Sequence, residues 1–191
     1  MGNSTESETQ AIRFPMRPDV DTEVFIFDTS SLVELKHVSR EAREVAKEAM
    51  NFLAKDGRLL FPTTVLKELS AYQGKNDLPM RWADKHRGDC LKDPIMTTVA
   101  SVMASVPDVI DSEKVSGEEE ADPYVLALGM DVRSDGLDPV VVSEERNDKH
   151  RLSMHTACGL LRLHKLDLRS FVRDRAGRTS AATSMHSTAQ D

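Results

Sequence analysis

Four short runs of apolar residues divide the chain, and segments with helical spacing separate them. The runs lie at 24–27, 58–61, 140–142 and 162–166, and polar or turn-forming residues bound each of them. Short apolar runs of this kind are typical of strands that are buried on both faces. Because the strands alternate with helices, the pattern predicts an α/β sandwich with a mainly parallel sheet.

Helix start and stop signals fill the segments between the strands. Ser39 is suited to cap a long helix whose apolar residues recur every three or four positions, and Gly57 is suited to end it. Asp93 and Asp122 each precede a proline, the pattern of a cap followed by proline at the first helical position. We therefore predict helices after both, and further helices at 31–38, 64–72, 80–91, 149–158 and 168–173.

Composition bounds the domain organisation and the class of protein. Residues 1–21 and 176–191 are poor in apolar side chains, so we predict disordered tails around one domain at 22–175. The formal charge of −7 argues against a protein that coats nucleic acid nonspecifically. It leaves a metal-dependent nuclease possible, because a bound cation inverts the local sign.

Cysteine usage and hydropathy indicate a cytoplasmic protein. Cys90 and Cys158 are far apart and have no CxxC spacing, which suits a reducing compartment rather than a zinc site or a disulfide framework. No apolar run approaches the roughly 18 residues that span a bilayer, and no signal peptide is recognisable. We expect no contact with a membrane.

Carboxylates begin or interrupt apolar segments at several places in the chain, with no Lys or Arg close by on the same face. Brought together, such acids would repel one another unless a cation were present. Ligand sets made only of oxygen select Mg²⁺ or Mn²⁺ rather than zinc, and such ions suit phosphodiester hydrolysis. The acids are Asp28, Glu68, Asp122 and either Glu144 or Glu145, with Ser30 and Ser143 as supporting hydroxyls.

Each acid also has a structural interpretation. Asp122 could simply cap its helix, and Glu68 could reach solvent from a helix edge. Alternation at the end of the third strand puts one of Glu144 and Glu145 inward and the other outward. Asp28 is harder to explain, because a carboxylate at the end of a buried strand is costly without a partner.

Basic and histidine side chains near these acids have two interpretations as well. A basic run contains Arg146, Lys149 and His150, and it could contact an RNA backbone or simply begin a solvated helix. His86 and His155 fit no metal motif, so we assign them to the surface. Residues 118–120 are three glutamates in succession, and we assign them to a solvated loop.

Four segments resemble the motifs of PIN domains, the metal-dependent ribonucleases that include bacterial VapC-type toxins. The segments are FDTSSL at 27–32, VLKEL at 65–69, ADPYVLAL at 121–128 and VVSEE at 141–145. The likeness covers roughly residues 23–173 and is closest to a poorly characterised bacterial PIN-like subgroup. Members of that subgroup end with a cysteine, a strand and a helix containing phenylalanine, as Cys158 and Phe171 do here. The resemblance implies a three-layer α/β/α sandwich with four or five strands.

The resemblance also implies an activity and a ligand set. Asp28, Glu68 and Asp122 match the metal-binding acids of the family, Ser30 its first-motif hydroxyl, and Ser143 the usual Thr or Ser. Glu145 stands where Asp is more common, so Glu144, Glu145 and Asp148 remain candidates for the fourth acid.

We expect from this a Mg²⁺- or Mn²⁺-dependent endoribonuclease that acts on RNA. It would be the toxin of a type II toxin–antitoxin pair, with a cognate antitoxin and a second copy of the chain as potential partners. The glutamate at 145 keeps open the alternative of a non-catalytic PIN-like module that binds RNA or protein. A DNA 5′-nuclease would need further acids and a helical arch that the sequence does not show.

Overall fold

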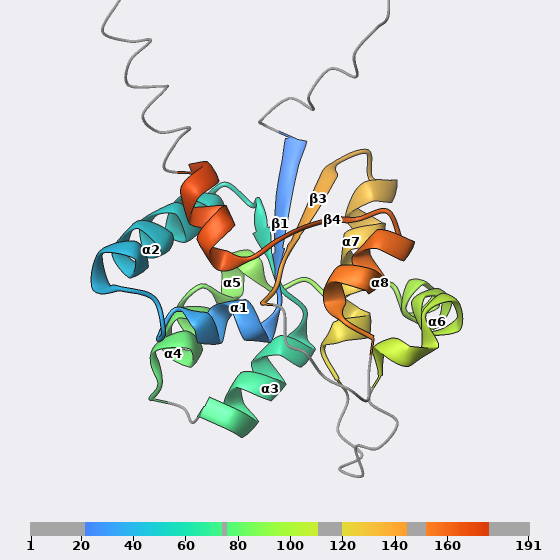
Figure 1. Ribbon diagram of the computed structural model, residues 1–191, viewed down its shortest axis with the longest axis horizontal. Coiled ribbons are helices and arrows are strands. Elements are labelled where there is room, and N and C mark those ends of the chain that lie inside the picture. The colour runs from blue at the N-terminus through green and yellow to red at the C-terminus, as the bar shows by residue number, and fades with distance from the viewer. Residues whose placement is uncertain (1–21, 74–75, 111–119, 145–151, 176–191) are drawn as a thin grey trace, which may run out of the picture.

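A computed structural model of the chain describes residues 22–73, 76–110, 120–144 and 152–175. Its centre is a four-stranded sheet in the order β2-β1-β3-β4, in which all neighbouring strands are parallel (Figure 1). The predicted α/β/α sandwich with a parallel sheet is confirmed. The predicted disordered tails lie outside the described residues. The strands are β1 Glu23–Phe27, β2 Leu59–Leu60, β3 Asp138–Val142 and β4 His164–Leu166.

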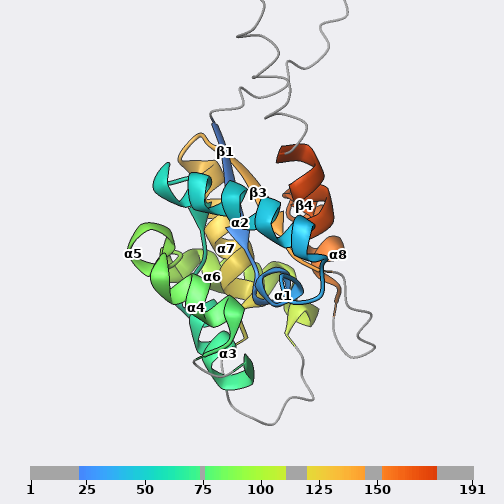
Figure 2. The same ribbon diagram turned by 90° about the vertical axis from the view of Figure 1, so that its left-hand side faces the viewer.

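Helices cover both faces of the sheet, as the two perpendicular views show (Figures 1 and 2). No helix in the described ranges is both long and apolar enough to cross a membrane. The helices are α1 Thr29–Glu34, α2 Arg40–Lys55, α3 Thr63–Gln73, α4 Leu78–Lys85, α5 Arg87–Cys90, α6 Met96–Ser105, α7 Asp122–Ser134 and α8 Met154–Leu160, with a 3₁₀ turn at Pro107–Val109 and a terminal helix at 168–175.

Strand β1 is the buried centre of the domain. Its side chains point alternately to the two faces of the sheet. On one face, α7 packs closely on Ile26 at Gly129. A Cβ atom at that position would already lie 3.5 Å from the Cδ1 atom of Ile26. On the other face, the ring of Phe171 from the terminal helix meets the rings of Phe25 and Phe27 edge-on, with centroids 5.3 Å apart in both pairs. Both faces are therefore sealed from water.

The strand order creates a switch point between β1 and β3. From β1 the chain continues through α2 to β2 on one side, and from β3 it continues through α8 to β4 on the other side. Phe27 pairs with Val142, so the residues that follow the two strands leave the sheet side by side. In parallel α/β sheets, ligands bind at the carboxyl ends of the strands at such a point.

Several local signals read from the sequence are confirmed. The Ser39 hydroxyl accepts a hydrogen bond from the backbone N–H of Ala42 at 3.2 Å and caps α2. Gly57 ends that helix with a φ of +69°, a conformation that other residues adopt only with strain. Cys158 is 1% exposed and belongs to the core.

The predicted role of Asp93 is wrong. The helix after Asp93 begins only at Met96, and the Asp93 carboxylate instead accepts from the backbone N–H of Thr63, at 2.7 Å, at the start of α3. The start of α6 is held from a neighbouring helix. Asp131 of α7, which is 8% exposed, accepts from the Ile95 N–H and the Thr98 hydroxyl, both at 2.7 Å.

Two other helix starts also differ from the prediction. Helix α1 begins at Thr29 rather than Ser31, because the Asp28 carboxylate accepts from the Thr29 N–H and starts the turn there. Helix α8 begins at Met154 with Ser153 as its cap, so the part of the predicted helix at 152–153 is not helical. Its predicted part at 149–151 lies outside the described residues.

We expect Asp131→Ala to lower the free energy of unfolding by about 3 kcal/mol, because it leaves two donors at the start of α6 without an acceptor. Urea denaturation measures this loss. Asp131→Asn is the matched control: it keeps one acceptor oxygen and should lose clearly less. An alanine variant within about 0.5 kcal/mol of the wild type would show that this contact does not fix α6.

Candidate functional site

Asp28 lies at the carboxyl end of β1, at the switch point, and is 5% exposed. Its backbone N–H donates to the carbonyl of Val142 at 3.0 Å, which ties the end of β1 to the end of β3. One carboxylate oxygen accepts from the Thr29 N–H at 2.7 Å, and the other accepts from the hydroxyls of Ser30 at 2.5 Å and Ser143 at 2.9 Å. In the part of the chain that the structure describes, no Lys, Arg or His pairs with this buried charge, and only neutral donors meet it.

The two serines form a fixed hydroxyl pair behind Asp28. Their Oγ atoms lie 3.3 Å apart, and Ser143 is 1% exposed. Ser30 donates to Asp28 and accepts from the backbone N–H of Glu144 at 3.0 Å, so its orientation is determined from both sides. The structure thus brings together the two hydroxyls that the sequence predicted as supports for a carboxylate.

Glu68 of α3 is joined to this group through Thr29. The Thr29 hydroxyl donates to one Glu68 oxygen at 2.5 Å, and the backbone N–H of Ala121 donates to the other at 2.9 Å. The side chain of Glu68 is half-buried and faces α1 and the start of α7. It therefore does not extend along the helix edge into solvent, which was its structural interpretation.

Asp122 is the first residue of α7 and is 9% exposed. The prediction that it caps the helix is wrong, because the cap position is occupied by Ala121, which forms no side-chain capping bond. Asp122 directly follows the residue whose N–H binds Glu68. A buried carboxylate at this position lies at the positive end of the α7 dipole.

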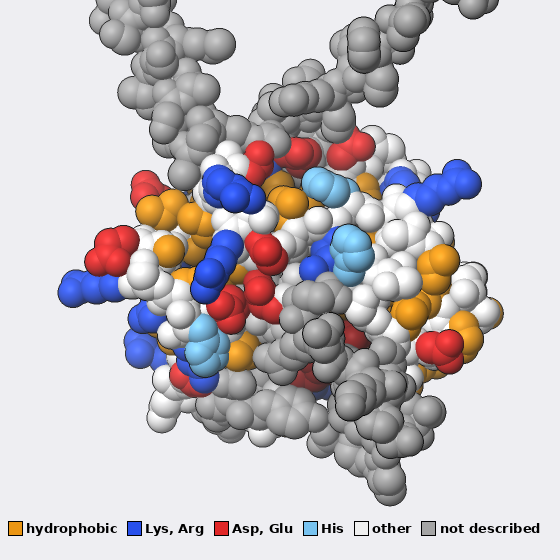
Figure 3. All heavy atoms as spheres, viewed as in Figure 1, with side chains coloured by type: hydrophobic (Ala, Val, Ile, Leu, Met, Phe, Trp, Pro, Cys, Tyr) orange, Lys and Arg blue, Asp and Glu red, His pale blue; other side chains and the backbone are white. Residues whose placement is uncertain are grey.

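Glu144 is turned toward the terminal helix. One of its carboxylate oxygens accepts from the Leu168 N–H at 2.8 Å. Burial raises the pKa of the Glu144 carboxyl above its usual range, and the nearby charges of Glu34 and Asp167 raise it further. On the face of the molecule drawn in Figure 3, acidic side chains gather near the middle and basic side chains lie beside them. The other predicted residues of this region, Glu145, Arg146, Asp148, Lys149 and His150, lie outside the described residues.

Comparison with known families places the chain in a group without an assigned activity. Residues 25–179 match the family described as "Domain of unknown function (DUF4411)". The chain belongs to the DUF4411 family. Among the curated proteins, no match to this DUF4411 domain is found. The matched range contains Asp28, Glu68, Asp122 and both serines, so function has to be argued from these side chains.

The donor set of the DUF4411 site fits a hard cation by its chemistry. Asp28, Glu68 and Asp122 offer only carboxylate oxygens, which suit Mg²⁺ or Mn²⁺. As arranged, both oxygens of Asp28 and of Glu68 accept hydrogen bonds from neutral donors. Within the ranges that the structure describes, no three His, Cys, Asp or Glu side chains converge closely enough to hold an ion. To bind a cation, Asp28 and Glu68 would have to give up some of the hydrogen bonds that their carboxylate oxygens accept.

Three residues of the DUF4411 domain have surroundings that the sequence did not predict. Thr29 joins Asp28 to Glu68, and its signal was the run of hydroxyl residues after the first strand. Glu120, predicted to be solvated, is 8% exposed because it immediately precedes the buried start of α7. His86, predicted to lie on the surface, is 7% exposed and packs on Trp82, with ring centroids 4.8 Å apart.

Proposed function

We propose that this DUF4411 domain is a Mg²⁺- or Mn²⁺-dependent endoribonuclease that hydrolyses phosphodiester bonds in RNA. The observation that supports it most is Asp28, a carboxylate buried at the sheet's switch point without a cationic partner in the described ranges. Thr29 links Asp28 to Glu68, and the Ala121 N–H links Glu68 to the segment that carries Asp122. A buried negative charge of this kind favours binding of a cation.

The positions and contacts of the side chains support distinct roles for them. Asp28, Glu68 and Asp122 would hold the cation, which would neutralise their charge, polarise the phosphodiester and acidify a water. Ser30 and Ser143 fix the carboxylate of Asp28 by donating to the same oxygen. Thr29 couples the orientation of Glu68 to that of Asp28. Glu145, which lies outside the described residues, stays a sequence prediction as a further ligand, together with Glu144 or Asp148.

The resemblance to VapC-type toxins also supports a proposal for the biological role of the protein. We propose a cytoplasmic toxin of a type II toxin–antitoxin pair, inhibited by a cognate antitoxin and able to form a homodimer. A neighbouring gene for a small DNA-binding protein would support this assignment.

One observation favours a second candidate, a non-catalytic PIN-like module that binds RNA or protein. Among the described side chains, no three potential ligands converge on one point, and Asp28 and Glu68 are satisfied by hydroxyl and amide donors. A module of this kind would bind its partner without metal and would leave RNA intact.

Cleavage of a labelled single-stranded RNA by the full chain tests the proposed function. We expect cutting in the presence of Mg²⁺ or Mn²⁺, loss of cutting with excess EDTA, and recovery when Mn²⁺ is added beyond the chelator. These results follow because the acids cannot hold a phosphodiester oxyanion near them without a cation. Cleavage that resists EDTA, or intact RNA under all three conditions, would contradict the proposal.

A further inference from the structure

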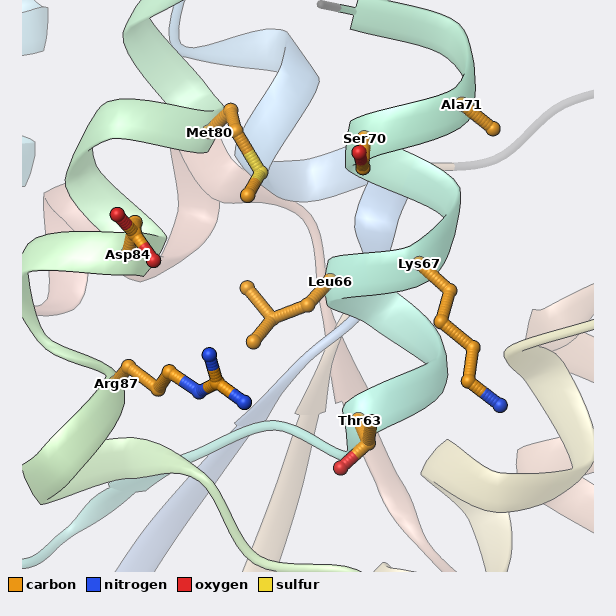
Figure 4. Close-up of a pocket in the computed structure, with 8 residues that line it drawn as sticks. All are labelled: Thr63, Leu66, Lys67, Ser70, Ala71, Met80, Asp84 and Arg87. Atoms are coloured by element: carbon orange, nitrogen blue, oxygen red, sulfur yellow. The ribbon is translucent and has the colours of Figure 1, made fainter. Parts of the chain in front are cut away.

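A groove of about 450 Å³ lies between α3 and the segment formed by α4 and α5. It is open to solvent, and Figure 4 shows side chains from both walls pointing into it. Leu66 from α3 and Met80 from α4 approach each other across the groove, and the guanidinium of Arg87 enters it from α5. The lining of the groove includes Leu66, Lys67, Ser70, Met80, Asp84 and Arg87.

The lining combines an apolar floor with the guanidinium of Arg87. Leu66 is 8% exposed, Met80 is half-buried, and together they offer an apolar surface. Arg87 is exposed, and no hydrogen bond or ion pair holds its guanidinium in the described part of the chain. Guanidinium groups bind phosphate through two parallel hydrogen bonds, and the face of a nucleobase can pack on apolar side chains. The two features together match a nucleotide.

Helix α3 connects this groove to the acids. Glu68 on α3 faces Thr29 and Ala121, whereas Leu66 faces the groove. Lys67 lies between them on the helix, and Figure 4 shows its side chain on the opposite side of α3 from Arg87. A helix with its side chains is about 10–12 Å across. A single strand of nucleic acid that crosses α3 therefore reaches both the groove and the acids over a short length.

We propose that this groove binds a nucleotide of single-stranded RNA that flanks the scissile phosphate. Arg87 contacts its phosphate, and the base lies on Leu66 and Met80. Asp84, on the same wall, disfavours a second phosphate and offers an acceptor for the 2′-hydroxyl, which DNA lacks. The inference rests on the proposed function, because it names where part of the substrate of that site lies.

Fluorescence anisotropy with a labelled single-stranded RNA tests the inference. The full chain carries Asp28→Asn, so that the RNA is not cut. We expect Arg87→Ala to weaken RNA binding by about tenfold. The slope of the logarithm of the binding constant against the logarithm of salt concentration should become shallower by about 0.7, the effect of one lost phosphate contact on a single strand. Arg81→Ala is the matched control, because Arg81 is exposed on α4 and does not line the groove. Its affinity and slope should equal those of the parent.

Three outcomes would overturn the inference: RNA that does not bind, an Arg87→Ala variant with unchanged affinity and slope, and equal losses in the two arginine variants. Both variants should melt at the temperature of the parent, since both side chains are exposed, and thermal melting checks this. Failure of the groove and failure of the proposed function are distinguishable. If the wild-type chain cleaves RNA with metal, but binding by the Asp28→Asn chain does not depend on Arg87, only the groove is rejected. Binding that depends on Arg87 without cleavage supports the groove and rejects the nuclease.

Discussion

If the DUF4411 domain is the proposed nuclease, replacing Asp28 with asparagine should lower the rate of metal-dependent RNA cleavage by more than about a hundredfold. Residues that only support the ligands of a metal are already worth roughly 10–100-fold, and a direct ligand should be worth more. Asp28 has no substitute at its position. It is the buried carboxylate that both serines and the Thr29 N–H orient at the end of β1. Asparagine keeps the shape but removes the charge on which a cation depends. Cleavage of labelled RNA at saturating Mn²⁺ measures the loss.

The Asp28→Asn variant should remain folded. Its amide oxygen can still accept from the Thr29 N–H, and the hydroxyls of Ser30 and Ser143 can rotate to accept from its amide nitrogen. Without metal, its melting temperature should be no lower than that of the wild type, since a buried charge has been removed. Glu48→Gln, which removes an exposed carboxylate on α2, serves as the control and should cleave at the wild-type rate. Cleavage by the Asp28→Asn variant at that same rate would remove Asp28 from the site.

Replacing Phe171 with alanine should lower the free energy of unfolding by about 3–5 kcal/mol, the usual cost of truncating a buried phenylalanine. Its ring is fully buried and meets the rings of Phe25 and Phe27 edge-on, both at 5.3 Å. The side chain therefore fastens the terminal helix to the strand that ends at Asp28. Urea denaturation measures the loss.

Phe171→Leu is the matched control for this variant. It keeps most of the buried apolar volume and should cost less than about 2 kcal/mol. A loss of under about 1 kcal/mol for Phe171→Ala would mean that the terminal helix does not pack on β1. The two phenylalanine variants thus test whether the helix at 168–175 supports the site.

The elements that the sequence predicted well are those whose signals are local. Short runs between segments with helical spacing identified the four strands of the described sheet. Ser39 and Gly57 marked the two ends of α2, because a cap and a left-handed glycine act within a few residues. Asp28 and Ser143 meet across 115 positions, because parallel strands of one sheet end at the same edge and the strand ends alone locate both residues there.

What the sequence did not reveal depends on partners that are distant in the chain. Asp93 follows the local rule for a cap, yet its carboxylate binds Thr63, 30 positions away. Asp131 holds the start of α6 from a helix 36 positions further along. Local patterns carry no information on such pairs. The role of Thr29, which binds Glu68 across 39 positions, was hidden in the same way.

Calorimetric titration of the full chain with Mn²⁺ tests the central claim most directly, because it detects the cation without requiring a substrate. We predict saturable binding to the wild type at submillimolar to millimolar Mn²⁺, and a loss of at least about tenfold in affinity for Asp28→Asn, since the variant lacks the central charge. The Glu48→Gln control should bind as the wild type does. No binding heat for the wild type at millimolar Mn²⁺, or equal affinity in the Asp28→Asn variant, would contradict the assignment of a metal-dependent nuclease site.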